Sequence, residues 1–173
     1  LSFVTSMSAD IDVTKDNNFK NFIRRKPLGV VFVIAPWNYP YLTAVNSIIP
    51  AMAAGNTVIL KHSAQTPLCA EQLYKSAQKT LPKNVFNYLH LNHQDGLRVV
   101  SDTRVNFVSF TGSVKAGYEV QKATHTKFID MALELGGKDP AYDRYDCDLE
   151  KTVENLVDVD EKFMINFWNL LFL

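Results

Sequence analysis

Four short polar segments carry the residues of this 173-residue chain that could bind or transform a ligand. Each segment directly follows an apolar run that is typical of a buried strand. The carboxyl ends of parallel strands share one edge of a sheet, and ligands bind at that edge. We therefore expect the four segments to meet at one rim. They are residues 35–38, 61–64, 110–113 with Gly117, and 134–138.

The segment Thr111-Gly112-Ser113 follows an apolar run and opens a helical pattern that contains Gly117. Gly112 permits close backbone approach, and the free N–H groups of a helix start can hold a phosphate together with the Ser113 hydroxyl. The spacing differs from G-x-G-x-x-G, so the usual dinucleotide fingerprint is absent. The residues therefore suggest a phosphate site, with a simple glycine-containing turn as the alternative.

Three further side chains at this edge have a possible role in binding. Lys61 follows a strand-like run and could bond ribose hydroxyls or a phosphate, unless it is an ordinary solvated lysine. Asn38 lies in a turn between prolines, where its amide could stabilise an oxyanion or only make local hydrogen bonds. Trp37 could line a ligand slot or belong to the core.

Glu134 ends the apolar run Met131-Ala132-Leu133 beside two glycines. A carboxylate that loses hydration there becomes a stronger base, which suits a general base. The alternative is an exposed strand-end glutamate paired with Lys138.

The remaining histidines and cysteines show no catalytic or metal-binding spacing. We expect the histidines to be surface or loop residues. Cys69 lies within a predicted helix and should be a small core residue, and Cys147 should be unreactive among acidic neighbours. No metal site is predicted. The histidines are His62, His90, His93 and His125.

Composition indicates an ordinary globular protein, with 47% hydrophobic residues and 18 basic against 18 acidic side chains. The balance gives no reason to expect nucleic acid as a partner. No apolar run approaches the roughly 20 residues that span a bilayer. No signal peptide is visible, so we expect a cytoplasmic protein without a membrane partner.

Alternating strand and helix patterns predict an α/β fold, a Rossmann-like parallel sheet with helices on both faces. We divide the chain into an N-terminal segment (1–27), a nucleotide-binding domain (28–158) and a divergent apolar tail (159–173). The N-terminal segment could hold one or two short strands. Strands are expected at 28–34, 56–60, 85–89, 105–110 and 128–135, and helices at 40–54, 66–79, 94–102, 113–125 and 148–158.

Taken in order, these segments resemble the aldehyde dehydrogenase superfamily over about residues 24–158. The matching strings are Ala35-Pro36-Trp37-Asn38-Tyr39-Pro40, residues 54–61, Phe110-Thr111-Gly112-Ser113 and residues 133–140. The resemblance implies a partial aldehyde dehydrogenase fold and the NAD- or NADP-dependent oxidation of an aldehyde substrate to a carboxylic acid. It also implies an oligomer for full-length members.

The resemblance also implies a role for each candidate residue. Asn38 becomes the oxyanion donor and Glu134 the general base that activates water. The residues that it implies for cofactor binding are Pro36, Trp37, Lys61, Gly112, Ser113, Gly117 and Leu135.

Two departures from the family pattern affect these expectations. Ala64 stands where many NAD-using members carry a glutamate, so NAD and NADP both stay open. The family nucleophile, a cysteine, would fall on Trp168, and residues 159–173 contain none. We therefore expect this chain alone to be a truncated, catalytically inactive form. The alternatives are a non-catalytic nucleotide-binding or interaction module and a poorly folded truncated product.

Overall fold

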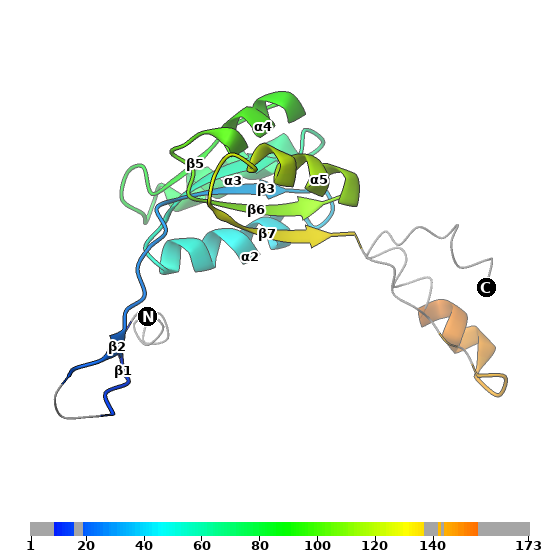
Figure 1. Ribbon diagram of the computed structural model, residues 1–173. Helices are drawn as coiled ribbons and strands as arrows, with labels where there is room; N and C mark the ends of the chain where they lie inside the picture. The colour runs from blue at the N-terminus through cyan, green and yellow to red at the C-terminus, as the bar shows by residue number, and fades with distance from the viewer. Residues whose placement is uncertain (1–8, 16–18, 137–141, 143, 156–173) are drawn as a thin grey trace. The chain divides into compact units, whose positions relative to one another are not determined.

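The computed structural model describes residues 9–15, 19–136, 142 and 144–155 (Figure 1). The compact unit that ends at Leu135 is built on a five-stranded sheet in which all neighbouring strands are parallel. The strand order β5-β4-β3-β6-β7 confirms the predicted parallel α/β sheet. The strands are β3 (Val30–Ala35), β4 (Thr57–His62), β5 (Phe86–Tyr88), β6 (Phe107–Gly112) and β7 (Asp130–Leu135).

Helices cover both faces of this sheet, as predicted. In the central strand β3, Val31 and Val33 belong to the core on one face, and Phe32 belongs to the core on the other. This alternation follows from the period of two along a strand. Figure 1 shows α4 and α5 on one side of the sheet and α2 on the opposite side. The helices are α2 (Pro40–Ala53), α3 (Pro67–Ala77), α4 (His93–Ser101) and α5 (Val114–Ala123).

Local sequence explains where helix α2 begins and ends. Pro40 occupies its first turn, where a missing N–H costs nothing. Gly55 follows the helix with a φ of 85°, and its N–H donates to the Met52 carbonyl at 2.9 Å. Gly55 therefore ends the helix, in agreement with the predicted range 40–54.

Strands β4 and β6 both run two residues further than predicted, to His62 and Gly112. The register explains this, because Lys61 lies opposite Ile34 on β3 and Gly112 lies opposite Leu135 on β7. Polar residues after an apolar run are typical of a loop, so the sequence pattern ends each strand too early. Backbone pairing with the neighbouring strand determines where the strand ends.

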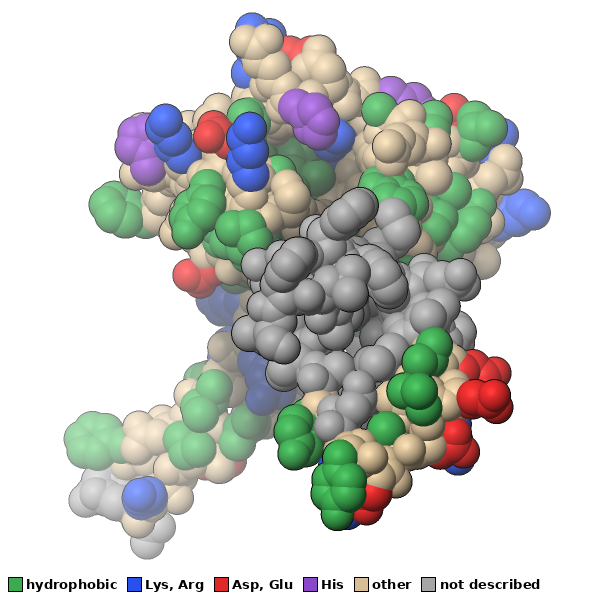
Figure 2. All heavy atoms as spheres, turned by 90° about the vertical axis from the view of Figure 1, so that its right-hand side faces the viewer, with side chains coloured by type: hydrophobic (Ala, Val, Ile, Leu, Met, Phe, Trp, Pro, Cys, Tyr) green, Lys and Arg blue, Asp and Glu red, His purple; other side chains and the backbone are tan. Residues whose placement is uncertain are grey.

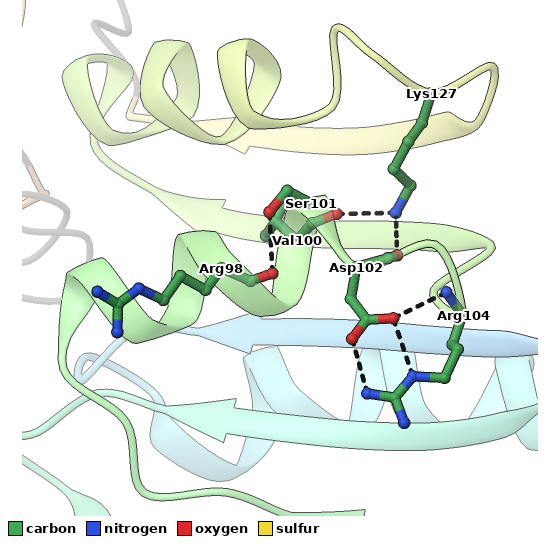
Figure 3. A network of polar contacts seen from close by, with 6 residues as sticks. All are labelled: Arg98, Val100, Ser101, Asp102, Arg104 and Lys127. Atoms are coloured by element: carbon green, nitrogen blue, oxygen red, sulfur yellow. Dashed lines mark hydrogen bonds and ion pairs between the residues drawn. The ribbon is translucent and has the colours of Figure 1, made fainter.

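At the amino edge of the sheet, Lys127 ties the α5–β7 connection to the end of α4 (Figure 3). Its Nζ donates to the carbonyl oxygens of Val100 at 2.8 Å and Asp102 at 2.6 Å. The Asp102 carboxylate accepts two bonds from the Arg104 guanidinium, which lowers the pKa of Asp102. This network lies at the opposite end of the strands from the candidate site.

The N-terminal segment contains two short antiparallel strands, β1 (Ile11–Asp12) and β2 (Phe22–Ile23). The Arg24 guanidinium pairs with the Asp10 carboxylate at 2.8 Å just beyond them. These are short strands of the kind predicted for residues 1–27.

The second unit runs from Gly136 to Leu173, and its described part contains a helix over residues 149–155. The Asp148 carboxylate accepts the N–H of Lys151 at 3.2 Å and so caps this helix. Residues 156–158 of the predicted helix, the tail 159–173 and Lys138 lie outside the described residues. The three-part domain division stays a prediction. Among the described residues, no helix is both long and apolar enough to cross a membrane.

Candidate functional site

A cavity of about 430 Å³ opens at the carboxyl edge of the sheet, with walls from α4 and α5. It lies at the junction of β3 and β6, where the chain order across the sheet reverses, a common ligand position in such folds. Its size is within the usual range for small-molecule sites. Figure 2 views this end of the molecule, with Lys, Arg and His side chains gathered on its upper part. The lining residues include apolar Ile34, Leu97, Phe110 and Val120 and polar Lys61, His93, Ser113, Lys115 and Glu119.

Lys61 is a buried cation in this cavity, with only 5% of its surface exposed. Its Nζ donates to the His62 carbonyl oxygen at 3.4 Å, and no carboxylate among the described residues pairs with it. Burial lowers the pKa of Lys61 below the ordinary lysine value. The alternative of a solvated lysine is therefore wrong, and a costly buried charge of this kind is typical of functional sites.

The start of α5 forms another wall of the cavity. Ser113 is the N-cap, and its hydroxyl oxygen accepts the Ala116 N–H at 3.3 Å. The first N–H groups of a helix have no partner within the helix, so they are available to an anion. Ser113 is exposed and lines the same cavity as Lys61. The structure thus brings together two of the predicted binding residues.

The two predicted glycines pack against neighbours beside the cavity. A Cβ at Gly112 would lie 2.7 Å from the Phe110 ring, and a Cβ at Gly117 would lie 2.5 Å from Leu135 Cδ2. Gly112 thus leaves room for the Phe110 ring, and Gly117 lets α5 approach the end of β7. Packing gives both glycines a role in addition to the predicted phosphate contact.

The remaining predicted residues lie along the same edge but do not line the cavity. Trp37 is 42% exposed and Asn38 is half-buried, in the turn between β3 and α2 that also contains Pro36. Glu134 is exposed at the end of β7, so the predicted loss of hydration is absent from this structure. No hydrogen bond joins Asn38 to Glu134 within the described chain.

His62 contradicts the expectation that the histidines are surface or loop residues. His62 is only 3% exposed, because β4 extends through it, and its ring nitrogens are hydrogen-bonded. His93 is exposed, as expected, and it also lines the cavity from the first turn of α4.

Helix α4 is the part of the cavity that sequence reasoning missed. Gly96 lies in its interior, and a Cβ there would meet Lys61 Cε at 3.5 Å. A glycine inside a helical pattern often has a packing or functional reason, so Gly96 was the available signal.

The two thiols belong to different units of the chain. Cys69 is half-buried on α3 and does not line the cavity, and Cys147 is exposed in the second unit. Within the described ranges no cluster of three or more His, Cys, Asp or Glu side chains could hold a metal ion.

The sheet order and the position of the cavity define the class of Rossmann-like nucleotide-binding folds. The model of the aldehyde dehydrogenase family matches residues 2–162. The chain therefore belongs to the aldehyde dehydrogenase family.

Individual relatives agree with this assignment. A D-glyceraldehyde dehydrogenase (NADP(+)) of Picrophilus torridus is 34% identical over 157 residues, which are 90% of this chain and 32% of the relative. The structure of a 3,6-anhydro-L-galactose dehydrogenase is 32% identical, has a TM-score of 0.83 and is matched over 93% of this chain and 34% of its own. PnpE in complex with nicotinamide adenine dinucleotide is 31% identical, with a TM-score of 0.79, over 88% of this chain and 32% of its own. The chain thus spans about a third of the length of these relatives.

Proposed function

We propose that this chain forms the adenine-nucleotide part of the cofactor site of an NAD(P)-dependent aldehyde dehydrogenase, which oxidises an aldehyde to a carboxylic acid. The observation that carries the proposal is the buried Lys61 ammonium, which shares one cavity with the capped start of α5. A cation without a carboxylate partner and free helix N–H groups suit an anionic nucleotide. The donor set therefore fits the dinucleotide.

Each wall of the cavity has a proposed task. Lys61 bonds the ribose hydroxyls of the adenosine or a phosphate on them, and Ser113 with the first N–H groups of α5 holds the pyrophosphate. Ile34 and Leu97 supply apolar surface for the adenine ring. The bound dinucleotide supplies the hydride acceptor for the oxidation.

The turn after β3 and the end of β7 have proposed roles in the reaction of a complete enzyme that also supplies the sulfur nucleophile. The Asn38 amide donates to the oxyanion that forms at the aldehyde carbon, and the Glu134 carboxylate accepts a proton from water. Pro36, Trp37 and Leu135 border the channel for the cofactor. These roles follow from family membership and from the shared edge of the sheet.

The residue at the family position of the nucleophile favours nucleotide binding without turnover by this chain alone. Attack on the aldehyde carbon needs a sulfur nucleophile beside the cofactor. The family position of that cysteine falls on Trp168, and Cys69 does not line the cavity. We propose that residues 1–173 bind the nucleotide but do not oxidise aldehydes. Purified chain that reduces NAD⁺ or NADP⁺ with an aldehyde above a buffer blank would contradict this.

The choice between NAD and NADP depends on the groups that face the 2′ position of the adenosine ribose. Ala64 is exposed just beyond β4 and offers no carboxylate to bond a ribose diol or repel a 2′-phosphate. Both cofactors are therefore candidates. Titration with 5′-AMP and with 2′,5′-ADP compares them directly, because the probes differ only in that phosphate.

The binding proposal is tested by adding 5′-AMP and, separately, nicotinamide mononucleotide to the ¹⁵N-labelled chain. We expect 5′-AMP to shift the backbone amides of Gly96, Ser113 and Ala116. The amides of Arg104 and Lys127, at the opposite edge, are an internal control and should not move. Nicotinamide mononucleotide should bind much more weakly. Absence of shifts at millimolar 5′-AMP, or equal shifts at both edges, would refute the proposal.

A further inference from the structure

The buried His62 ring joins three segments of the chain at the carboxyl edge of the sheet. Its Nε2 lies 2.9 Å from the carbonyl oxygen of Pro40, at the start of α2. Its Nδ1 lies 2.9 Å from the N–H nitrogen of Ser63 and 3.1 Å from Oγ1 of Thr66, the N-cap of α3. One side chain thus links the end of β4 to the starts of two helices.

These partners determine where the ring carries its proton. The Ser63 N–H can only donate, so Nδ1 must be the acceptor. The proton of the neutral ring is then on Nε2, which donates to the Pro40 carbonyl. Both ring nitrogens are satisfied, and the orientation of the ring is fixed.

The turn that carries Asn38 and the cavity that contains Lys61 are both connected to His62. Pro40 directly follows the turn that carries Asn38 and Tyr39, and Tyr39 has a φ of 44°, which is unfavourable for a residue other than glycine. On the other side, the His62 carbonyl accepts the hydrogen bond from the Lys61 ammonium. The turn with the proposed oxyanion donor and the proposed nucleotide lysine are therefore anchored to the same residue.

We propose that His62 is a positioning residue that holds the Asn38 turn against the end of β4 and keeps Lys61 in the cavity. Its effect on nucleotide affinity rests on the proposed function, whereas its effect on the turn does not. A leucine would fill the same space but leave the Ser63 N–H and the Thr66 hydroxyl without their partner. Its role therefore depends on the ring nitrogens and not on volume alone.

The first test is spectroscopic and uses the unmodified chain. ¹⁵N shifts of the histidine ring should show a single neutral His62 tautomer protonated at Nε2. A ring protonated at Nδ1, or exchanging between both forms, would overturn the proposal. This measurement does not depend on nucleotide binding or on the folding of a variant.

The second test compares His62→Leu with His62→Gln, whose amide can replace the Nε2 donor. We expect His62→Leu to shift the amides of Trp37 and Asn38 and to weaken 5′-AMP binding about 10-fold, as expected for one or two lost hydrogen bonds. His62→Gln should recover most of both effects. His90→Leu is the matched control, because His90 is an exposed histidine paired with Glu71 at 3.2 Å.

The outcomes separate this proposal from the proposed function. Equal effects of His62→Leu and His90→Leu on the turn amides would overturn the positioning role. If the unmodified chain binds no 5′-AMP, the proposed function fails, while the tautomer and the turn amides still test His62. Should His62→Leu fail to fold, the tautomer measurement and the His62→Gln comparison decide.

Discussion

Replacing Lys61 by methionine should change stability and nucleotide affinity in opposite directions. Methionine keeps an unbranched apolar stem. The structure has room beside the Lys61 stem, because a Cβ added at Gly96 would lie 3.5 Å from Lys61 Cε and 3.6 Å from Lys61 Cδ. The substitution removes a buried charge whose only hydrogen bond among the described residues is long, at 3.4 Å. A buried cation with so weak a partner opposes folding.

The expected magnitudes follow from these contacts. The hydrogen bond is at the limit of useful geometry, so its loss costs well under 1 kcal/mol. Relief of the desolvated charge exceeds that loss, and Lys61→Met should raise the free energy of unfolding by about 1 kcal/mol. A charged donor to a ligand contributes about 1.5–3 kcal/mol, so 5′-AMP affinity should fall roughly 10- to 100-fold.

Urea denaturation and calorimetric titration measure the two effects in the same preparations. Lys79→Met is the control, because Lys79 is exposed beyond α3 and does not line the cavity. It should leave affinity unchanged and stability within about 0.5 kcal/mol. A Lys61→Met chain that is less stable, yet binds 5′-AMP as tightly as the parent, would show that Lys61 is structural and refute the reasoning.

Three further predictions concern pH, a helix end and a backbone turn. Affinity for 5′-AMP should fall as pH rises through the lowered pKa of Lys61. The free energy of unfolding should rise over the same pH interval, because the unfolded chain holds that proton more tightly than the folded chain. Parallel titrations of Lys61→Met should show neither trend. Lys127→Met removes two charge-assisted bonds to carbonyls at the end of α4 and should destabilise by about 2 kcal/mol in urea, whereas exposed Lys122→Met should cost less than about 0.5 kcal/mol. Gly29→Ala should lower the melting temperature by several degrees, because Gly29 has a φ of 121° and an added Cβ would overlap Asn106 Oδ1. Gly96→Ala is the control, because Gly96 lies in a helix with room for a Cβ. It should leave the melting temperature unchanged or raise it.

The order of elements could be predicted because each local signal agreed with the fold. Gly55 and Asn84 have φ values of 85° and 67°, and glycine and asparagine are residue types that tolerate positive φ. Ser113 was expected at a helix start and is the N-cap of α5. Such signals depend on a residue and its immediate neighbours, so sequence alone is enough to read them.

The errors lie where distant segments decide the environment. Lys61 and His62 look like loop residues, but pairing with Ile34 and Ala35 extends the strand and buries them. His93 reaches the cavity because α4 packs beside α5 on the same face of the sheet, and no local sequence pattern contains that information. The sequence therefore predicted the edge that carries the site but not which polar residues at that edge are buried.

Burial also distinguishes the two halves of the proposed chemistry. Preorganised dipoles and charges act most strongly where water is excluded. Lys61 and His62 meet that condition, whereas Trp37 and Glu134 are exposed in the same structure. Within the described residues, the buried polar groups Lys61 and His62 thus lie on the proposed nucleotide side, and Glu134 is exposed. Nucleotide binding is for this reason the activity that we propose for these residues by themselves, and we expect Glu134 to act as a base only when another surface excludes water from the end of β7.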